Sequence, residues 1–306
     1  MNRAEISYLK KNKRIYFFCL LSLLFVLTAC KSSQKLQKGN VTEIEAQIIS
    51  TQRVVNREET GVNRIVSYQL VHEDIPVSFD GVRIAFITDL HYPSYFKSRH
   101  LTALTASLDS LNCDMLCLGG DFHENTDSIS HLFKTLSVLD YPLGAYGVLG
   151  NNDYESGYEI VVEEMTKNGF QCLEHQVDTI WKEDEYILIA GVKNPFDLKN
   201  NGESPTLGLS DSDYVILLTH TPDYAEDVPI THTDLVLAGH THGGQVTIFG
   251  FAPIVPSKYD QRFLKGLVYN SKQIPMIVST GIGTSNADIR LGAPSEIIVI
   301  ELKSIQ

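Results

Sequence analysis

Five short apolar runs recur between residues 82 and 238, and each has the length and continuous hydrophobicity of a strand buried on both faces. The runs are Val82–Thr88, Met115–Leu118, Tyr146–Leu149, Tyr214–Thr219 and Leu235–Ala238. Two helix-like stretches, Leu101–Leu111 and Ile129–Leu139, separate the early runs. Strands that alternate with helices are typical of βαβ units, so the pattern predicts an α/β fold.

Three more strand-like runs follow residue 238 without an obvious helix between them: Val246–Phe249, Met276–Ser279 and Ile297–Leu302. We expect them to form a second, more antiparallel sheet. The strand-like pattern begins at Ile65, and the polar stretch before it, residues 31–47, has the composition of a flexible spacer. The pattern therefore predicts a tether over residues 30–64 and one folded domain over residues 65–306.

Each of the five apolar runs leads directly into residues that can bind a metal ion. In order along the chain these are Asp89 and His91, then Asp121, then Asn151, Asn152 and Asp153, then His220, and finally His240 and His242. Ligands of open α/β sheets bind beyond the carboxyl ends of the strands. Five strand ends that carry Asp, Asn or His therefore predict one shared site.

The type and number of these residues indicate a metal centre with two ions. Without Asn152 and Asp153 the set has two carboxylates, one amide oxygen and four imidazoles. These seven candidate ligands are too many for one tetrahedral ion, but they suit two ions that share a bridging ligand. Carboxylate and imidazole ligands without thiolate favour manganese, iron or zinc. Residues i and i+2 of an extended chain point to the same face, so we expect Asp89 with His91, and His240 with His242, to address one cavity. The glycines at positions 119, 120, 150 and 239 suit turns where the backbone approaches the site closely.

The amino terminus has the pattern of an export signal. Basic residues between Lys10 and Arg14 precede an apolar run, Ile15–Ala29, which as a helix would span only about 22 Å of a roughly 30 Å hydrocarbon core. This pattern predicts a secretory signal peptide over residues 1–29. Leu27–Cys30 resembles the lipobox of bacterial lipoproteins, which implies cleavage before Cys30 and lipidation of that residue. The alternative is an uncleaved anchor, and both place the domain in the cell envelope, outside the cytoplasm.

The charge of the chain argues against one class of partner, and its cysteine spacing argues against a disulfide. A formal net charge of −12 makes the chain a poor candidate for binding nucleic acid through its phosphates. Three of the five cysteines, Cys113, Cys117 and Cys172, lie in the predicted domain. Cys113 and Cys117 would lie about 13 Å apart along one strand, too far for a disulfide. We expect three buried, unpaired cysteines.

The ordered motifs D-x-H, G-D, G-N-x-D, a single His and G-H-x-H resemble those of the calcineurin-like metallophosphoesterases, in particular the bacterial YkuE- and YaeI-type phosphodiesterases. The resemblance extends from about Asp80 to the carboxyl terminus and includes Gly243-Gly244-Gln245 and the segment Ser279–Ser285 with Arg290. It implies a two-sheet sandwich with helices on both outer faces.

The resemblance also implies roles for single residues and a mechanism. The implied ligands are Asp89, His91 and His242 for one ion, Asn151, His220 and His240 for the other, and Asp121 as the bridge. A hydroxide between two divalent ions would attack phosphorus in line while the ions polarise the phosphoryl oxygens.

Asn152 departs from the family pattern, which usually reads G-N-H-[D/E] here. That histidine is thought to assist the leaving group or to hold phosphate, whereas an amide cannot give up a proton at ordinary pH. Some related UDP-diacylglucosamine hydrolases also lack this histidine, so its absence does not imply an inactive enzyme. Catalytic roles for Asn152 and Asp153, and the source of the leaving-group proton, stay open.

Several other residues have two interpretations each. His123, two residues past Asp121, could line the cleft or be structural. Arg290 could contact substrate phosphate or pair with an internal carboxylate. The cluster of Tyr92, Tyr95 and Phe96 could line a groove, face a membrane or pack as an ordinary loop. We expect the remaining histidines to be structural or superficial: His72, His100, His131, His175 and His232.

The sequence as a whole predicts a dinuclear, metal-dependent phosphoester hydrolase, with phosphodiesters or pyrophosphates as substrates. A phosphomonoesterase and a catalytically weak metal-binding protein of the envelope are the alternatives. We expect the substrate to be an envelope lipid or polymer and the membrane to be reached through the lipid on Cys30. We expect no nucleic acid partner.

Overall fold

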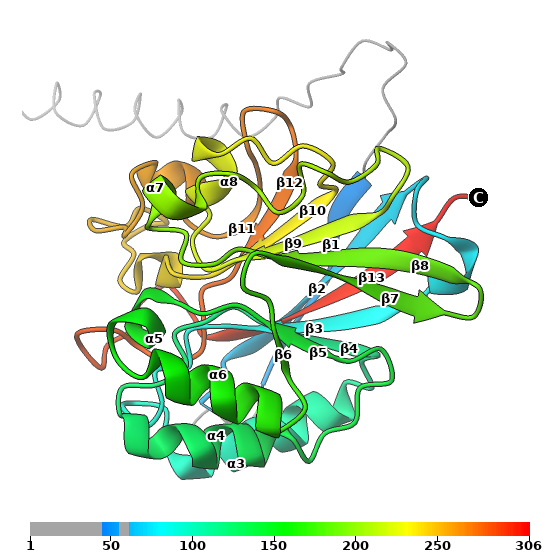
Figure 1. Ribbon diagram of the computed structural model, residues 1–306. Coiled ribbons are helices and arrows are strands. Elements are labelled where there is room, and N and C mark those ends of the chain that lie inside the picture. Colours follow the sequence, from blue (N-terminus) through cyan, green and yellow to red (C-terminus); the bar gives the residue numbers. More distant parts are fainter. Residues whose placement is uncertain (1–44, 55–60) are drawn as a thin grey trace, which may run out of the picture. The chain divides into compact units, whose positions relative to one another are not determined.

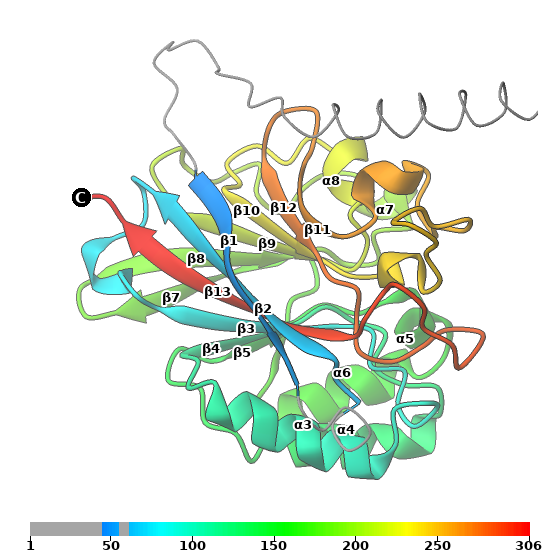
Figure 2. The same cartoon turned by 180° about the vertical axis from the view of Figure 1, so that it is seen from behind.

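The computed structural model describes residues 45–54 and 61–306, which form two stacked β-sheets with helices on the outside (Figure 1). The strands are β1 (Glu45–Arg53), β2 (Arg64–His72), β3 (Arg83–Ile87), β4 (Met115–Leu118), β5 (Ala145–Gly147), β6 (Gln171–Cys172), β7 (Gln176–Lys182), β8 (Glu185–Gly191), β9 (Val215–Thr219), β10 (Leu235–Ala238), β11 (Gly266–Tyr269), β12 (Pro275–Val278) and β13 (Glu296–Ser304). The seven-stranded sheet has the order β1-β2-β13-β3-β4-β5-β6, and the six-stranded sheet has the order β11-β12-β10-β9-β8-β7. Figure 2 shows β1, β2 and β13 from behind.

Helices cover the outer face of each sheet. They are α3 (Ser98–Ser110), α4 (Ile129–Leu136), α5 (Asn151–Glu155), α6 (Tyr158–Lys167), α7 (Leu198–Asn201) and α8 (Tyr224–Asp227), with short 3₁₀ turns at Val77–Phe79, Thr126–Ser128, His242–Gly244 and Asp260–Phe263. Helices α3, α4 and α6 pack on the seven-stranded sheet, and α7 and α8 lie over the six-stranded sheet (Figure 1). The predicted two-sheet α/β sandwich with helices on both outer faces is confirmed.

The alternation of side chains along each strand explains why the strands are apolar throughout. In β3, Ile84 and Phe86 join the core between the two sheets, whereas Ala85 and Ile87 join the core beneath the helices. In β9, Ile216 faces the core between the sheets. Both faces of these strands are buried, so the five apolar runs are strands, as predicted.

The site edge of the domain is set by the direction of the strands. Strands β3, β4 and β5 are parallel neighbours, and so are β8, β9, β10 and β12. The segments that carry the predicted ligands follow directly after the carboxyl ends of β3, β4, β5, β9 and β10.

Two expectations about the later strands were wrong. Met276–Ser279 overlaps β12, but β12 pairs parallel to β10, and Ile297–Leu302 overlaps β13, which inserts between β2 and β3 of the other sheet. Val246–Phe249 is not a strand, because its residues make only isolated bridges before the chain turns back. Strand partners come from distant parts of the chain, so local hydrophobicity could not assign them.

The folded domain begins before residue 65. Strand β1 lies within the stretch predicted as tether, and it pairs antiparallel with β2 from Glu45 opposite Val71 to Arg53 opposite Arg64. Cys30 and the predicted signal peptide lie outside the described residues. Among residues 45–54 and 61–306, no helix is both long enough and apolar enough to cross a membrane.

The cysteine prediction holds with one exception. Cys113, Cys117 and Cys172 are unpaired, and the first two are buried. Cys172 is only half-buried, because it lies at the edge of the seven-stranded sheet in β6.

Candidate metal centre

A first ligand group, Asp89, His91 and His242, gathers where β3 and β10 end. One possible ligand atom from each lies within 4.8 Å of the others. His91 Nε2 is 3.1 Å from His242 Nε2, and His242 Nε2 is 3.4 Å from Asp89 Oδ1. All three residues are buried, so this arrangement concentrates one carboxylate and two imidazoles away from bulk water.

A second ligand group, Asp121, His220 and His240, lies beyond the ends of β4, β9 and β10 and meets the same 4.8 Å criterion. Asp121 Oδ2 is 3.4 Å from His220 Nε2. The same oxygen is 3.6 Å from His91 Nε2 of the first group. One carboxylate oxygen thus faces an imidazole of each group, which is the position a bridging ligand needs.

Two buried atoms at this site have no hydrogen-bond partner among the described residues: His220 Nε2 and Asn151 Oδ1. His220 Nδ1 lies 2.7 Å from the carbonyl of Gly119, so it donates there and turns Nε2 toward Asp121 Oδ2, 3.4 Å away. Asn151 Nδ2 donates to Asn152 Oδ1 at 2.9 Å, which turns Asn151 Oδ1 the other way. Buried polar atoms without partners are costly, and a metal ion held by the second group would satisfy both. The donor set therefore fits a metal.

Five of the seven predicted ligands have left-handed backbone. The φ angles are 54° at Asp89, 45° at His91, 52° at Asp121, 68° at His240 and 51° at His242. Residues other than glycine rarely adopt this region, although Asn, Asp and His do so more often than most, and such strain concentrates at functional sites. Asp89 and His91 are therefore not in extended chain, and neither are His240 and His242, so the reason given for the two pairs was wrong. The outcome holds, because Asp89 and His91 share one ligand group and His240 and His242 line one cavity.

The glycine prediction is borne out by the spacing around Gly150 and Gly239. A Cβ atom at Gly150 would lie 2.1 Å from Asp121 Oδ1, and one at Gly239 would lie 2.4 Å from Asp89 Oδ2. Any side chain at either position would displace a predicted ligand.

Electrostatics in this cluster are dominated by burial and by carboxylate–imidazole pairs. Burial would raise the pKa of Asp121, but His220, His91 and the backbone N–H of Asn152 together outweigh it and hold that pKa well below its usual range. Burial would lower the pKa of His220, but Asp121 raises it to about 9. Burial and then His220 lower the pKa of His240 to about 3. Positive charge is therefore favoured beside Asp121, and a divalent ion would supply it.

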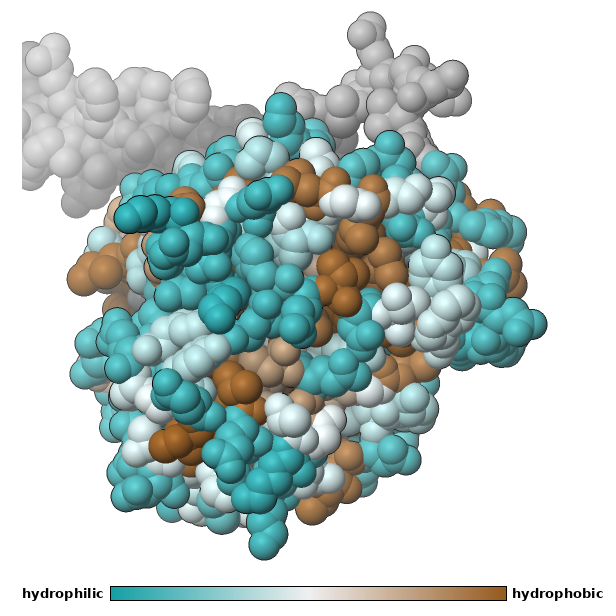
Figure 3. Space-filling model, in the orientation of Figure 1, coloured by the Kyte–Doolittle hydropathy of each residue, from teal (hydrophilic) through white to brown (hydrophobic). Residues whose placement is uncertain are grey.

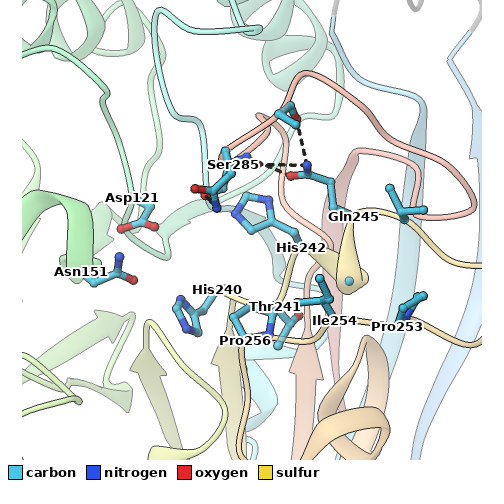
Figure 4. A pocket seen from close by; sticks show the side chains of 14 residues that line it. Asp121, Asn151, His240, Thr241, His242, Gln245, Pro253, Ile254, Pro256 and Ser285 are labelled. Carbon is cyan, nitrogen blue, oxygen red and sulfur yellow. Dashed lines mark hydrogen bonds between the residues drawn. The ribbon is translucent and has the colours of Figure 1, made fainter.

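The two groups open into one cavity of about 560 Å³. Asp121, Asn151, His240 and His242 lie around one part of it, with Pro253 and Ile254 farther along (Figure 4). Gln245 closes the wall, because its side chain bonds the backbone of Ser285 and the carbonyl of Ala287.

Comparison with known proteins agrees with this geometry. The family model described as calcineurin-like phosphoesterase matches residues 82–244, more than half of the chain. The chain belongs to this family. It is a metal-dependent phosphoric ester hydrolase, and its family uses divalent metals that the two ligand groups can bind.

Relatives with similar sequences have the same domain. The uncharacterized metallophosphoesterase YkuE of Bacillus subtilis is 30% identical over 236 residues, which cover 75% of this chain and 82% of the relative. An uncharacterized metallophosphoesterase of Aquifex aeolicus is 29% identical over 253 residues, which cover 80% of this chain and 94% of the relative. Among solved structures, the phosphopantetheinyl hydrolase of Mycobacterium tuberculosis matches with a TM-score of 0.36 and 14% identity over 56% of this chain and 86% of that one.

Asn152 and Asp153, for which catalytic roles were left open, hold neighbouring residues in this phosphoesterase. Asn152 Nδ2 donates to Glu124 Oε1 at 3.1 Å, and its backbone N–H donates to Asp121 Oδ1 at 2.9 Å. Asp153 is fully buried and accepts backbone N–H groups of Gly150, Asp121 and Phe122 at 2.8 to 3.0 Å. Neither side chain lines the cavity, so both are placed to position ligands rather than to touch substrate.

His123 and Arg290 also lie away from the cavity wall. His123 is 1% exposed, and its Nε2 is 3.8 Å from Asp153 Oδ1. Arg290 donates to the carbonyls of Gly283 and Ala293 and lies 3.3 Å from His242 Nδ1. The geometry gives no support to substrate contact by either residue.

Two residues near the ligands were missed by sequence reasoning. Glu124 Oε1 lies 2.5 Å from His91 Nδ1, on the ring edge opposite the metal-facing nitrogen. Phe196 places its ring 5.0 Å from that of His240 although it is 46% exposed. Glu124 follows Asp121 by three residues, which is the one signal that could have suggested it.

Proposed function

We propose that this enzyme is a phosphodiesterase that works with two divalent ions, one at each ligand group, with Asp121 shared between them. The observation that carries the proposal is the position of Asp121 Oδ2, within 3.6 Å of an imidazole from each group. When bound, two such ions would polarise the phosphoryl oxygens and activate water for in-line attack on phosphorus.

The chain's own residues prepare the site for that chemistry. Asp121 is fixed through its second oxygen by the backbone N–H of Asn152. The His220 ring is fixed by the Gly119 carbonyl, and the His91 ring by Glu124. Fixed ligands lose little conformational entropy when an ion binds, which keeps the geometry close to the one required.

The cavity wall supports a diester rather than a monoester. Among the described residues that line it, none is Lys or Arg. A monoester carries nearly two negative charges and gains most from extra cations, whereas a diester carries one. The apolar wall made by Val246, Pro253 and Ile254 gives room for a second ester group.

We also propose that the enzyme is held at an envelope membrane through lipid on Cys30, where an envelope lipid or polymer would be its substrate. The basic residues, the short apolar run and Leu27–Cys30 support this location. Palmitate labelling of the Cys30→Ser variant tests it, since labelling as strong as in the wild type contradicts lipidation.

Hydrolysis of two nitrophenyl esters tests the diesterase proposal. The Mn²⁺-loaded protein should cleave bis(p-nitrophenyl) phosphate faster than p-nitrophenyl phosphate, with two ions per folded chain by elemental analysis. Asp121→Ala should lose both ions and several orders of magnitude in rate, whereas His131→Ala, at an exposed histidine of α4, should retain activity. A preference for the monoester, a single ion, or no hydrolysis of either ester contradicts the proposal.

A further inference from the structure

Six large apolar side chains are exposed on two loops beside the metal cavity. They are Ile248, Phe249, Phe251, Ile254, Ile289 and Leu291, with exposed fractions from 55% to 106%, and we name them the apolar rim. Ile254 also lines the cavity, so the rim continues the cavity wall to the surface. Hydrophobic surface is visible at the left edge of Figure 3, on the side where Figure 1 shows the yellow and orange loops.

The tip of the rim is a tight hairpin turn with an unusual residue. Ile248 and Phe251 exchange two backbone hydrogen bonds of 2.8 and 3.0 Å. Between them, Phe249 and Gly250 have φ angles of 51° and 86°, the pattern of a type I′ turn. The first central position of this turn favours Asn, Asp or Gly, because bulky side chains rarely adopt positive φ. Phe249 is strained there and fully exposed, so its side chain serves something other than the fold.

Loose packing does not explain this exposure. Thr247, just before the hairpin, is 5% exposed and donates its backbone N–H to the Leu291 carbonyl at 2.7 Å. Ala252, just after it, is 1% exposed, and its backbone N–H and carbonyl both bond the Gln261 side-chain amide. The hairpin is anchored at both ends, and only its apolar side chains reach solvent.

We propose that the apolar rim inserts into the surface of a lipid bilayer and thereby presents the metal cavity to membrane-borne phosphoesters. This contact is additional to the lipid on Cys30. It rests on the proposed membrane location for its biological setting, but the rim itself comes from the described residues. A fluid bilayer can accept a protruding hairpin without a preformed complementary hollow, and exposed aromatic and aliphatic side chains are typical of proteins that lie on the interface.

The chain before the domain is long enough for this orientation. Strand β1 is antiparallel to β2, β2 is parallel to β13, and β13 is antiparallel to β3, so Glu45 lies at the sheet edge opposite Asp89. The nine residues of β1 span about 30 Å. The 14 residues between Cys30 and Glu45 can reach up to about 50 Å. A lipid on Cys30 and the rim can therefore enter the same membrane.

Binding to neutral vesicles tests the rim directly. Residues 43–306 form one compact unit, and the described residues among them hold three apolar cores, so we expect a chain that starts at Lys31 to fold without the anchor. We expect it to co-sediment with phosphatidylcholine vesicles, and to do so equally at 0.1 and 0.5 M salt because the contact is apolar. Phe249→Asn should weaken vesicle binding about tenfold or more, since burying a Phe in lipid is worth at least that factor.

Phe249→Asn also separates docking from folding. Asn suits a type I′ turn before Gly, so the variant should unfold at the same temperature as the wild type or a higher one. Val138→Asn is the matched control, because Val138 is 74% exposed just after α4 and should bind vesicles as the wild type does. A Phe249→Asn variant that binds like the wild type overturns the proposal.

A fluorescent reporter tests insertion itself. Trp181 is the single tryptophan and is exposed on β7, so Trp181→Phe provides a silent background. In that background Phe249→Trp should shift its emission to shorter wavelength with vesicles and be quenched by brominated lipid. Unchanged emission, no vesicle binding by the wild type, or a wild-type dimer that Phe249→Asn dissociates would each contradict the proposal. Failure of the proposed enzyme function is separate, because it appears as no hydrolysis of a soluble diester.

Discussion

Glu124 provides a sharp test of the first ligand group, because it touches a predicted ligand without reaching the cavity. Its Oε1 lies 2.5 Å from His91 Nδ1 and 3.1 Å from Asn152 Nδ2. The carboxylate thus fixes the His91 ring so that Nε2 points to Asp121 and His242. We predict that Glu124→Gln and Glu124→Ala weaken metal binding while the protein stays folded.

The expected size follows from the exposure and chemistry of Glu124. Loss of a carboxylate behind a metal-binding histidine commonly weakens metal binding about 10- to 100-fold, or about 1.4 to 2.7 kcal/mol. The Glu124 side chain is 39% exposed, so water screens part of its charge. Glu124→Gln keeps an oxygen for the His91 N–H and should lie near tenfold. Glu124→Ala keeps none and should lie nearer 100-fold.

Calorimetric titration of the chelator-treated protein with Mn²⁺ measures this change. Glu155→Gln is the matched control, since it removes the same charge from an exposed residue of the neighbouring helix α5. The control should bind Mn²⁺ within about twofold of the wild type. Wild-type affinity in both Glu124 variants would refute the positioning role, and an equal loss in Glu155→Gln would assign the effect to net charge.

Three further predictions concern other parts of the molecule. Gly239→Ala should lose Mn²⁺ affinity at least tenfold, because its Cβ would lie 2.4 Å from Asp89 Oδ2, and calorimetry that shows normal binding would contradict the close approach. Burial raises the pKa of Asp234 to about 6, so the folded state binds its proton more tightly than the unfolded state and wild-type stability falls as pH rises from about 4 to 6. Asp234→Asn should remove that part of the pH dependence, at most about 3 kcal/mol by urea unfolding, and an unchanged pH profile would contradict it. Because the Asn152 amide cannot protonate a leaving group, methyl p-nitrophenyl phosphate should be cleaved at least about 100-fold faster than methyl phenyl phosphate, and similar rates would reveal a general acid.

The strands and their metal-binding ends could be predicted because both are local features. A strand buried on both faces must be apolar throughout, and the residue that follows it lies at the sheet edge. That is why Asp89, Asp121 and His220 could be placed in one site without any knowledge of strand order. Which strands pair depends on distant segments, so the insertion of β13 between β2 and β3 had no local signal.

The rest of the site depended on contacts that no spacing shows. Glu124 reaches His91 only because the chain after β4 runs parallel to the chain after β3, where the His91 and Tyr92 N–H groups bond the carbonyls of Asp121 and Phe122. The segment Val246–Phe249 carries enough hydrophobic residues for a strand, but a type I′ turn takes up its end and exposes Phe249. Hydrophobicity alone predicted that this segment would be buried, whereas the backbone geometry of the turn places Phe249 in solvent.

Hydrogen bonds within the protein offset the strain in the backbone of the ligand residues, and this predicts how the metal-free enzyme behaves. A left-handed residue other than glycine costs about 1–2 kcal/mol, so five of them are a large fraction of a typical domain's stability. The Asp89 N–H bonds the Gly120 carbonyl at 2.9 Å, the Asp121 N–H bonds Asp153 at 2.8 Å, and the His240 N–H bonds Asp89 at 3.0 Å. These bonds hold the strained segments to one another without any ion. Chelation should therefore lower the melting temperature and leave a cooperative unfolding transition with unchanged far-ultraviolet circular dichroism. Loss of that transition on chelation would mean that the metal, not this network, maintains the strained backbone.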